Sequence, residues 1–109
     1  MELGDSRGRV HIVDDDPSFA TAIARRLKQA GYDVATYTSA RQLLDRLPTG
    51  NEPSCIILDV RMPGLDGPAL QKRLSELGST MPIVFLTAYA DTRTVVQTLK
   101  AGALDFLTL

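Results

Sequence analysis

The amino-acid sequence predicts one α/β domain with a parallel sheet of five strands and four helices. Short apolar, β-branched runs alternate with segments of helical periodicity along the whole chain. Residues 82–86 are almost continuously apolar, which is typical of a parallel strand that is covered on both faces. A chain of 109 residues is long enough for one domain with its own hydrophobic core.

The first strand is predicted at residues 9–13, where a β-branched run stops at three consecutive acids. Asp16 is a candidate N-cap, and Pro17 stands at the first helical position. Apolar residues then recur at helical spacing as far as Gly31, and glycine commonly follows the last turn of a helix. We therefore expect the first helix to lie between Pro17 and Gly31.

The next strand and helix are predicted on turn and capping signals. Residues 33–37 contain three β-formers and read as a second strand with imperfect alternation. Ser39 and Gln42 have the spacing of a capping box, and the apolar stripe that follows is stopped by Pro48. The apolar run 55–58 is predicted as the third strand.

The second half of the chain continues the same alternation. After Gly67-Pro68, apolar residues at helical spacing predict a third helix that Gly78 closes, and the next strand is predicted at residues 82–86. Asp91 can cap a fourth helix that ends near Gly102. Residues 103–107 then supply the last strand.

Strict alternation of strands and helices implies right-handed crossovers, with helices on both faces of the sheet. The flavodoxin-like strand order 2-1-3-4-5 is the doubly wound arrangement that we predict for five such strands. Ligands of these folds bind outside the carboxyl ends of the strands, next to the point where the winding direction reverses. In this order that point lies between the first and third strands.

Composition excludes several classes of partner. A formal net charge of −1 gives no electrostatic reason for this domain to bind nucleic acid or an anionic membrane directly. The single cysteine, Cys55, rules out a disulfide framework within the chain. The sequence shows no signal peptide and no apolar run long enough to span a membrane. We expect a cytoplasmic protein whose residues 1–8 form a flexible N-terminal segment.

Acidic residues follow the two strands that meet at the predicted switch point. Asp14 and Asp15 end the first strand, and Asp59 ends the third. Neighbouring strands lie about 4.8 Å apart, so these carboxylates would repel one another unless a cation neutralised them. Oxygen ligands suit a hard cation, and a site with few carboxylates and room for water favours Mg²⁺ over Ca²⁺. We therefore expect a magnesium site there.

Four short motifs stand in order along the chain, and they are specific together although each alone is weak. They are Val13-Asp14-Asp15-Asp16, Leu58 to Gly67, Leu86-Thr87-Ala88 and Lys100 to Phe106. In these motifs the chain resembles the receiver domains of two-component response regulators, over residues 9–107. The resemblance makes residues 9–109 a receiver domain that is truncated before the last helix of the family.

The resemblance implies a phosphorelay chemistry for the acidic cluster. Asp59 would accept a phosphoryl group from a sensor histidine kinase and form an acyl phosphate. Asp15, Asp59 and the backbone carbonyl of Arg61 would hold Mg²⁺, and Asp14 would assist through the waters of the metal. Such a domain catalyses its own phosphorylation and dephosphorylation, but it is a signalling module and not an enzyme that turns over a metabolite.

Two further residues match the positions of the family's switch. Thr87 would sense the phosphoryl group through its hydroxyl, and Phe106 would be the switch aromatic that moves inward with it. Phosphorylation would then change a surface formed by the fourth helix and the last strand. The residues of these motifs resemble those of regulators of the LuxR or FixJ kind. That resemblance implies a helix-turn-helix output domain that binds DNA and regulates transcription, and we expect it to be missing from this chain.

One position departs from the family pattern. Three residues after the switch aromatic the family has a lysine that binds the phosphoryl group, and here that residue is Leu109. If Leu109 is native, the site lacks a cation; if the chain is incomplete, which we favour, the full protein carries the lysine. Without the family's last helix an apolar sheet face would lie open, so a homodimer is a further expectation.

Two alternative functions remain open at this point. A degenerate receiver could act only as a protein-interaction scaffold, and Leu109 is the residue that supports this reading. A phosphatase of the haloacid dehalogenase type also uses an aspartate at a strand end with Mg²⁺. Those enzymes place a second aspartate two residues after the nucleophile, where this chain has Arg61.

Overall fold

The computed structural model describes residues 8–47, 53–60, 66–87 and 92–108. Its five strands pair in parallel in the order β2-β1-β3-β4-β5, which confirms the predicted flavodoxin-like sheet. The strands are β1 (Arg9–Val13), β2 (Asp33–Tyr37), β3 (Ser54–Leu58), β4 (Ile83–Thr87) and β5 (Asp105–Thr108). The helices are α1 (Pro17–Gln29), α2 (Ala40–Asp45), α3 (Gly67–Glu76) and α4 (Thr92–Lys100).

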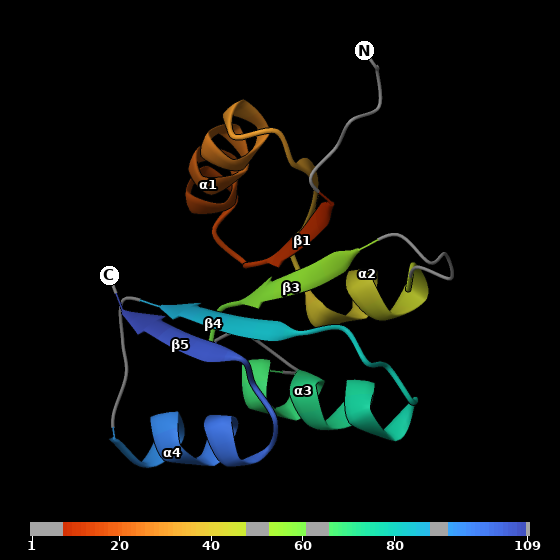
Figure 1. Ribbon diagram of the computed structural model, residues 1–109, viewed down its shortest axis with the longest axis vertical. Coiled ribbons are helices and arrows are strands. Elements are labelled where there is room, and N and C mark those ends of the chain that lie inside the picture. Colours follow the sequence, from red (N-terminus) through yellow and green to blue (C-terminus); the bar gives the residue numbers. More distant parts are fainter. Residues whose placement is uncertain (1–7, 48–52, 61–65, 88–91, 109) are drawn as a thin grey trace.

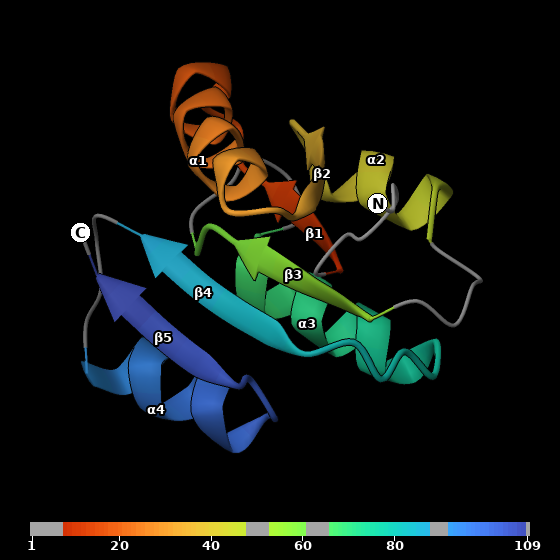
Figure 2. The same cartoon turned by 45° about the horizontal axis from the view of Figure 1, so that its top comes forward.

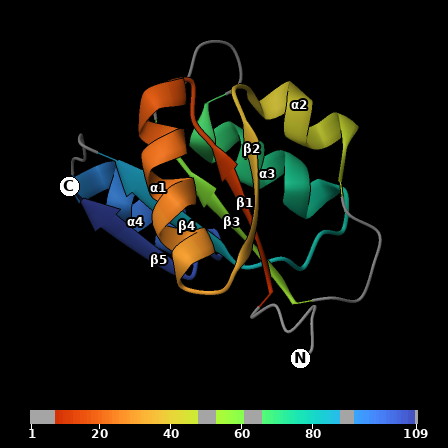
Figure 3. The same ribbon diagram turned by 90° about the horizontal axis from the view of Figure 1, so that it is seen from above.

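The helices cover the sheet from two sides. Figure 1 shows α1 on one side of the sheet and α2, α3 and α4 on the other, and Figure 3 shows α1 lying along β1 and β2 from above. Strands that are joined through helices in this way must run parallel, and all their carboxyl ends meet at one edge of the sheet. No helix of the described residues is long and apolar enough to cross a membrane.

The predicted helix starts are confirmed by side-chain caps. Asp16 Oδ1 accepts hydrogen bonds from the backbone N–H groups of Ser18 (3.0 Å) and Phe19 (3.3 Å) at the start of α1. Ser39 Oγ accepts from Gln42 N–H at 3.3 Å. Gln42 returns the bond one residue earlier than in a standard capping box, since its Oε1 accepts from Thr38 N–H at 2.8 Å.

Two predicted boundaries were wrong by a few residues. Helix α2 ends at Asp45 and does not reach Pro48. A proline disfavours helical backbone at the residue before it, here Leu47. Strand β5 begins at Asp105 and not at Ala103, because the N–H of Ala103 bonds back to the Thr98 carbonyl at 3.0 Å and closes α4.

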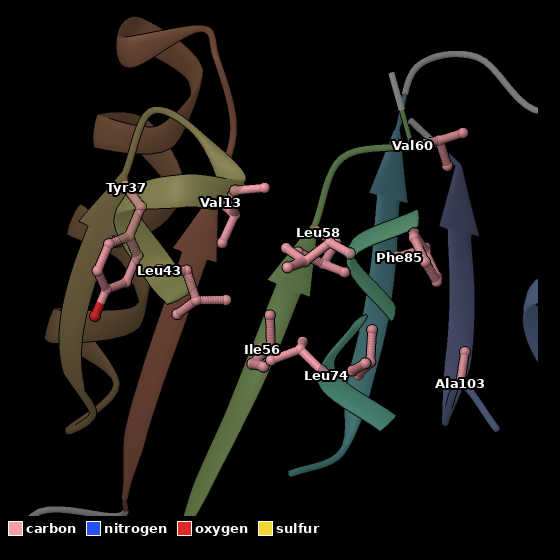
Figure 4. Packing of buried hydrophobic residues seen from close by; sticks show 12 residues of the cluster. Val13, Tyr37, Leu43, Ile56, Leu58, Val60, Leu74, Phe85 and Ala103 are labelled. Carbon is pink, nitrogen blue, oxygen red and sulfur yellow. The ribbon is translucent and has the colours of Figure 1, made fainter. Parts of the chain in front are cut away.

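The main core fills the layer between the sheet and helices α2 and α3. Its central side chains come from alternate positions of neighbouring strands, as the period of two in a strand requires. Figure 4 shows Ile56, Leu58 and Phe85 from the sheet packed near Leu43 of α2 and Leu74 of α3. All five of these side chains are buried.

A smaller cluster lies on the opposite face, where α1 packs on the sheet. Val10 and Ile12 of β1 contact Ala20 and Ala24 of α1, and small residues on the helix allow this close approach. Leucines and isoleucines at the margin of this cluster are only half-buried. The core is therefore deeper on the face that carries α2 and α3.

Candidate functional site

The pairing of β1 with β3 builds the acidic site that the sequence predicted. Val13 and Leu58 are register partners, so the next residues along the two strands, Asp14 and Asp59, emerge side by side. The N–H of Asp59 donates to the Val13 carbonyl at 3.1 Å and continues the ladder by one step. Both acids therefore stand at the carboxyl-end edge of the sheet, at the switch point.

Three carboxylates converge at this edge. Asp14, Asp15 and Asp59 each offer one oxygen, and these three atoms lie within 4.8 Å of one another. Asp14 is buried, Asp59 is half-buried and Asp15 is exposed. The cluster is thus closed on the side of the sheet and accessible from the side of Asp15.

The backbone holds Asp14 firmly in this position. Its N–H donates to the Tyr37 carbonyl at 3.0 Å, which ties it to the end of β2. Its Oδ1 accepts a hydrogen bond of 2.9 Å from the N–H of Asp16. Asp16 itself caps α1, so the three consecutive acids divide as predicted: Asp16 starts the helix, and Asp14 and Asp15 face the site.

Burial makes Asp14 an unusually weak acid for an aspartate. Its pKa is raised from 3.8 to about 6, chiefly by loss of hydration and also by the negative charges of Asp59, Asp15 and Asp16. The hydrogen bond from Asp16 N–H opposes this shift but does not cancel it. Burial and the neighbouring carboxylates therefore both disfavour the charged form of Asp14.

The donor set fits a hard divalent cation. Carboxylate oxygens from two neighbouring strands, with one exposed side for water, are the kind of ligands that Mg²⁺ accepts in proteins. A magnesium ion would also remove the repulsion that weakens Asp14 as an acid. The residues present thus match the metal that the sequence predicted.

The structure describes two of the four remaining predicted site residues, Thr87 and Phe106. Leu58 pairs with Phe85, so Thr87, two residues later on β4, ends its strand at the same edge as Asp59. Phe106 is half-buried on β5, and its ring stacks on Phe85 with centroids 5.6 Å apart. Arg61 and Leu109 lie outside the described residues.

Gly67 is a residue of the site region whose role the sequence did not reveal. A Cβ atom on this glycine would collide with the Asp59 carbonyl oxygen and would lie 2.7 Å from Cε1 of Phe85. Only a residue without a side chain lets α3 begin so close to the backbone behind Asp59. The sequence signal was a glycine directly after the N-cap Asp66, where the helix itself does not need one.

His11 of β1 packs against Tyr37 of β2. It is buried on the face of α2, and its Nδ1 lies 3.0 Å from the Tyr37 hydroxyl. The two rings also stack, with centroids 5.8 Å apart. Since the Tyr37 carbonyl binds Asp14 N–H, this pair supports the strand end next to the acidic cluster.

Comparison with known proteins finds one family. A model of the response regulator receiver domain matches residues 10–108. The chain is 38% identical over 102 residues to the transcriptional regulatory protein FixJ of Bradyrhizobium diazoefficiens, covering 94% of this chain and 49% of FixJ. It is also 38% identical over 101 residues to the DNA-binding transcriptional regulator NtrC of Klebsiella pneumoniae, covering 93% of this chain and 21% of NtrC.

Solved structures give the same relationship. The full-length FixJ from B. japonicum superposes with a TM-score of 0.85 at 38% identity, over 94% of this chain and 50% of that one. The chain therefore spans half or less of the length of these relatives.

Proposed function

Because this chain belongs to the family of response regulator receiver domains, we propose that Asp59 is its phosphoacceptor and that a sensor histidine kinase is its phosphodonor. Receiver domains are signalling domains that work with histidine kinases and bind Mg²⁺ at an acidic pocket. The observation that carries the proposal is the convergence of Asp14, Asp15 and Asp59 at the switch point of the sheet.

The proposed step is an in-line displacement at phosphorus. A carboxylate oxygen of Asp59 forms a bond to the phosphorus of a phosphohistidine as the phosphorus–nitrogen bond breaks. The electron pair of that bond returns to the imidazole nitrogen, which then takes up a proton. Asp59 suits this role because its side chain is only half-buried at the open edge of the sheet, within reach of an incoming group.

The surrounding acids would prepare Asp59 for this step. Asp15, Asp59 and the backbone carbonyl of Arg61 would hold Mg²⁺, and Asp14 would bind through its waters. When bound, the metal supplies the positive charge that lets a carboxylate approach a phosphoryl group. The hydrogen bonds that fix Asp14 to Tyr37 and Asp16 keep this side of the site rigid before any ligand arrives.

We further propose that the signal leaves the site through Thr87 and Phe106. Thr87 lies on β4 and Phe106 on β5, which pair with each other, and β5 contacts α4. The output is an attached DNA-binding domain in the full-length protein, in line with relatives that are transcriptional regulators and of which this chain covers 49% (FixJ) and 21% (NtrC). The receiver itself contacts kinase and output, and not DNA.

The test is phosphorylation by a small phosphodonor. With acetyl phosphate and Mg²⁺, the chain should gain the mass of one phosphoryl group, and hydroxylamine should remove it because an acyl phosphate is labile. Asp59→Asn should abolish the gain, because the amide is a poor nucleophile, whereas Asp45→Asn on the exposed side of α2 should not. Incorporation that survives in Asp59→Asn would contradict the assignment, and no incorporation in the unsubstituted chain would favour the scaffold alternative.

A further inference from the structure

We propose that Phe85 is a positioning residue that couples the backbone at Asp59 to the ring of Phe106. The inference rests on the proposed function, because it names a route by which a change at Asp59 reaches the switch aromatic. This route differs from the one through Thr87 because it passes through the buried core. It runs from the Asp59 backbone to Gly67 at the start of α3, then to Phe85, and then to Phe106.

The first contact joins the backbone at Asp59 to the Phe85 ring through Gly67. The N–H of Gly67 donates to the Val60 carbonyl at 3.1 Å, which anchors the start of α3 to the segment after β3. A Cβ atom on Gly67 would collide with the Asp59 carbonyl, and it would lie 2.7 Å from Phe85 Cε1 and 3.1 Å from Val60 Cα. Gly67 is therefore enclosed between this backbone and the aromatic ring.

The second contact joins Phe85 to Phe106. They are register partners on β4 and β5, and their rings stack with centroids 5.6 Å apart and planes inclined by 25°. Phe85 is completely buried, whereas Phe106 is half-buried at the margin of the core. Figure 4 shows Phe85 in the core layer between Leu58 and the strand that carries Phe106.

The packing makes this series of contacts stiff. A protein core is close-packed, so a ring that is enclosed on all sides cannot move without displacing its neighbours. Gly67 has no side chain that could rotate to absorb a shift of the Asp59 carbonyl. A movement there is passed to the Phe85 ring, and from that ring to Phe106, which is free to respond because part of it faces solvent.

The experiment compares two sets of backbone amide NMR signals on saturation with beryllofluoride and Mg²⁺, which mimic the acyl phosphate. Asp14 and Asp59 report binding at the site, and Phe106 reports the remote response. In Phe85→Leu the shifts at the site should persist while the Phe106 shift falls to less than half. The matched control is Leu43→Ala, which removes a similar number of core carbons on α2, away from this route, and should keep both shifts.

The outcomes separate this inference from the proposed function. A Phe106 shift of full size in Phe85→Leu would overturn the coupling role alone. Equal losses of the Phe106 shift in Phe85→Leu and Leu43→Ala would also overturn it, since the effect would then be general loosening of the core. No shift of Asp14 and Asp59 in the unsubstituted chain would overturn the proposed function, and the coupling role with it.

A second variant tests the other end of the route without ligand. In Gly67→Ala the new methyl group must push on the Asp59 carbonyl and on Phe85, so the ligand-free Phe106 amide should already shift. Ser75→Ala on the exposed side of α3 should leave it in place. If the Phe106 signal of Gly67→Ala matches that of the unsubstituted chain, the contact through Phe85 carries no coupling.

Discussion

At the scale of single residues, the site is organised around an aspartate that is poorly hydrated and surrounded by like charges. Asp14 is 4% exposed, and the pKa of its carboxyl is raised to about 6 chiefly because it is buried. Two backbone hydrogen bonds, from Asp16 N–H to its carboxyl and from its own N–H to the Tyr37 carbonyl, hold the residue in place. A group of this kind links the stability of the metal-free protein to pH.

We predict that the metal-free chain loses stability as the pH rises through 6. The pKa of Asp14 is about 6 in the folded state and 3.8 in a free chain, so the folded state binds the proton more tightly. The contribution of Asp14 to the free energy of unfolding should therefore fall by about 2–3 kcal/mol between pH 4 and pH 7. Urea unfolding in the presence of a chelator, repeated across this range, measures the change.

Asp14→Asn provides the comparison for that measurement. The amide cannot ionise, so the variant should lack this part of the pH dependence and should be more stable than the unsubstituted chain at pH 7 without metal. Added Mg²⁺ should stabilise the unsubstituted chain more than the variant. Parallel pH profiles for the two proteins would show that Asp14 is not the group responsible.

At the scale of elements, the position of α3 decides how closely the core approaches Asp59. The helix begins where Asp66 Oδ1 accepts the N–H of Ala69 at 2.9 Å. Its first residue, Gly67, then lies directly against the backbone of residues 59 and 60. The N-cap fixes the residue at which α3 begins. It therefore also fixes the position of Gly67 against the backbone of residues 59 and 60.

We predict that Asp66→Ala lowers the free energy of unfolding by about 1 kcal/mol. Alanine leaves the N–H of Ala69 without its side-chain acceptor, which is the usual cost of losing an N-cap. Chemical denaturation measures the loss, and Ser75→Ala, at an exposed position of the same helix, should change stability by less than half of that amount. An equal effect of both substitutions would contradict the capping role.

At the scale of the whole molecule, the two faces of the sheet are covered unequally. Helix α1 packs on β1 and β2, and on that side no described helix is drawn over β4 and β5 in Figure 2. Val84, Leu86 and Leu107 face this side, because they alternate with Phe85 and Phe106, which face the main core. Leu107 is 47% exposed. We call these three residues the open face.

We predict that the 109-residue chain associates with itself through the open face at high concentration. Apolar side chains that lie together on a sheet lower their free energy when a second copy removes them from water. Sedimentation velocity over a range of concentrations should show a rising average mass. Leu107→Lys should reduce it, whereas Leu104→Lys, an exposed residue before β5, should have less effect. A constant monomer mass for the unsubstituted chain would contradict the prediction.

Much of this molecule follows from local sequence patterns. The alternation of apolar runs with helical periodicity predicted all five strands and four helices, and Asp16 and Ser39 marked helix starts that the structure confirms. These signals are local: a cap, a proline or a period of two acts within a few residues. The acids after the first and third strands were visible for the same reason, and the strand order then placed them together.

Tertiary structure decided what depends on contacts between distant segments. The raised pKa of Asp14 comes from burial and from Asp59, which is far away in sequence. The close approach of Gly67 to Phe85 and the stacking of Phe85 on Phe106 arise only when α3, β4 and β5 pack together. A sequence states which residues can form an element, but distances between elements are set by packing, since each side chain must fill the space that its neighbours leave.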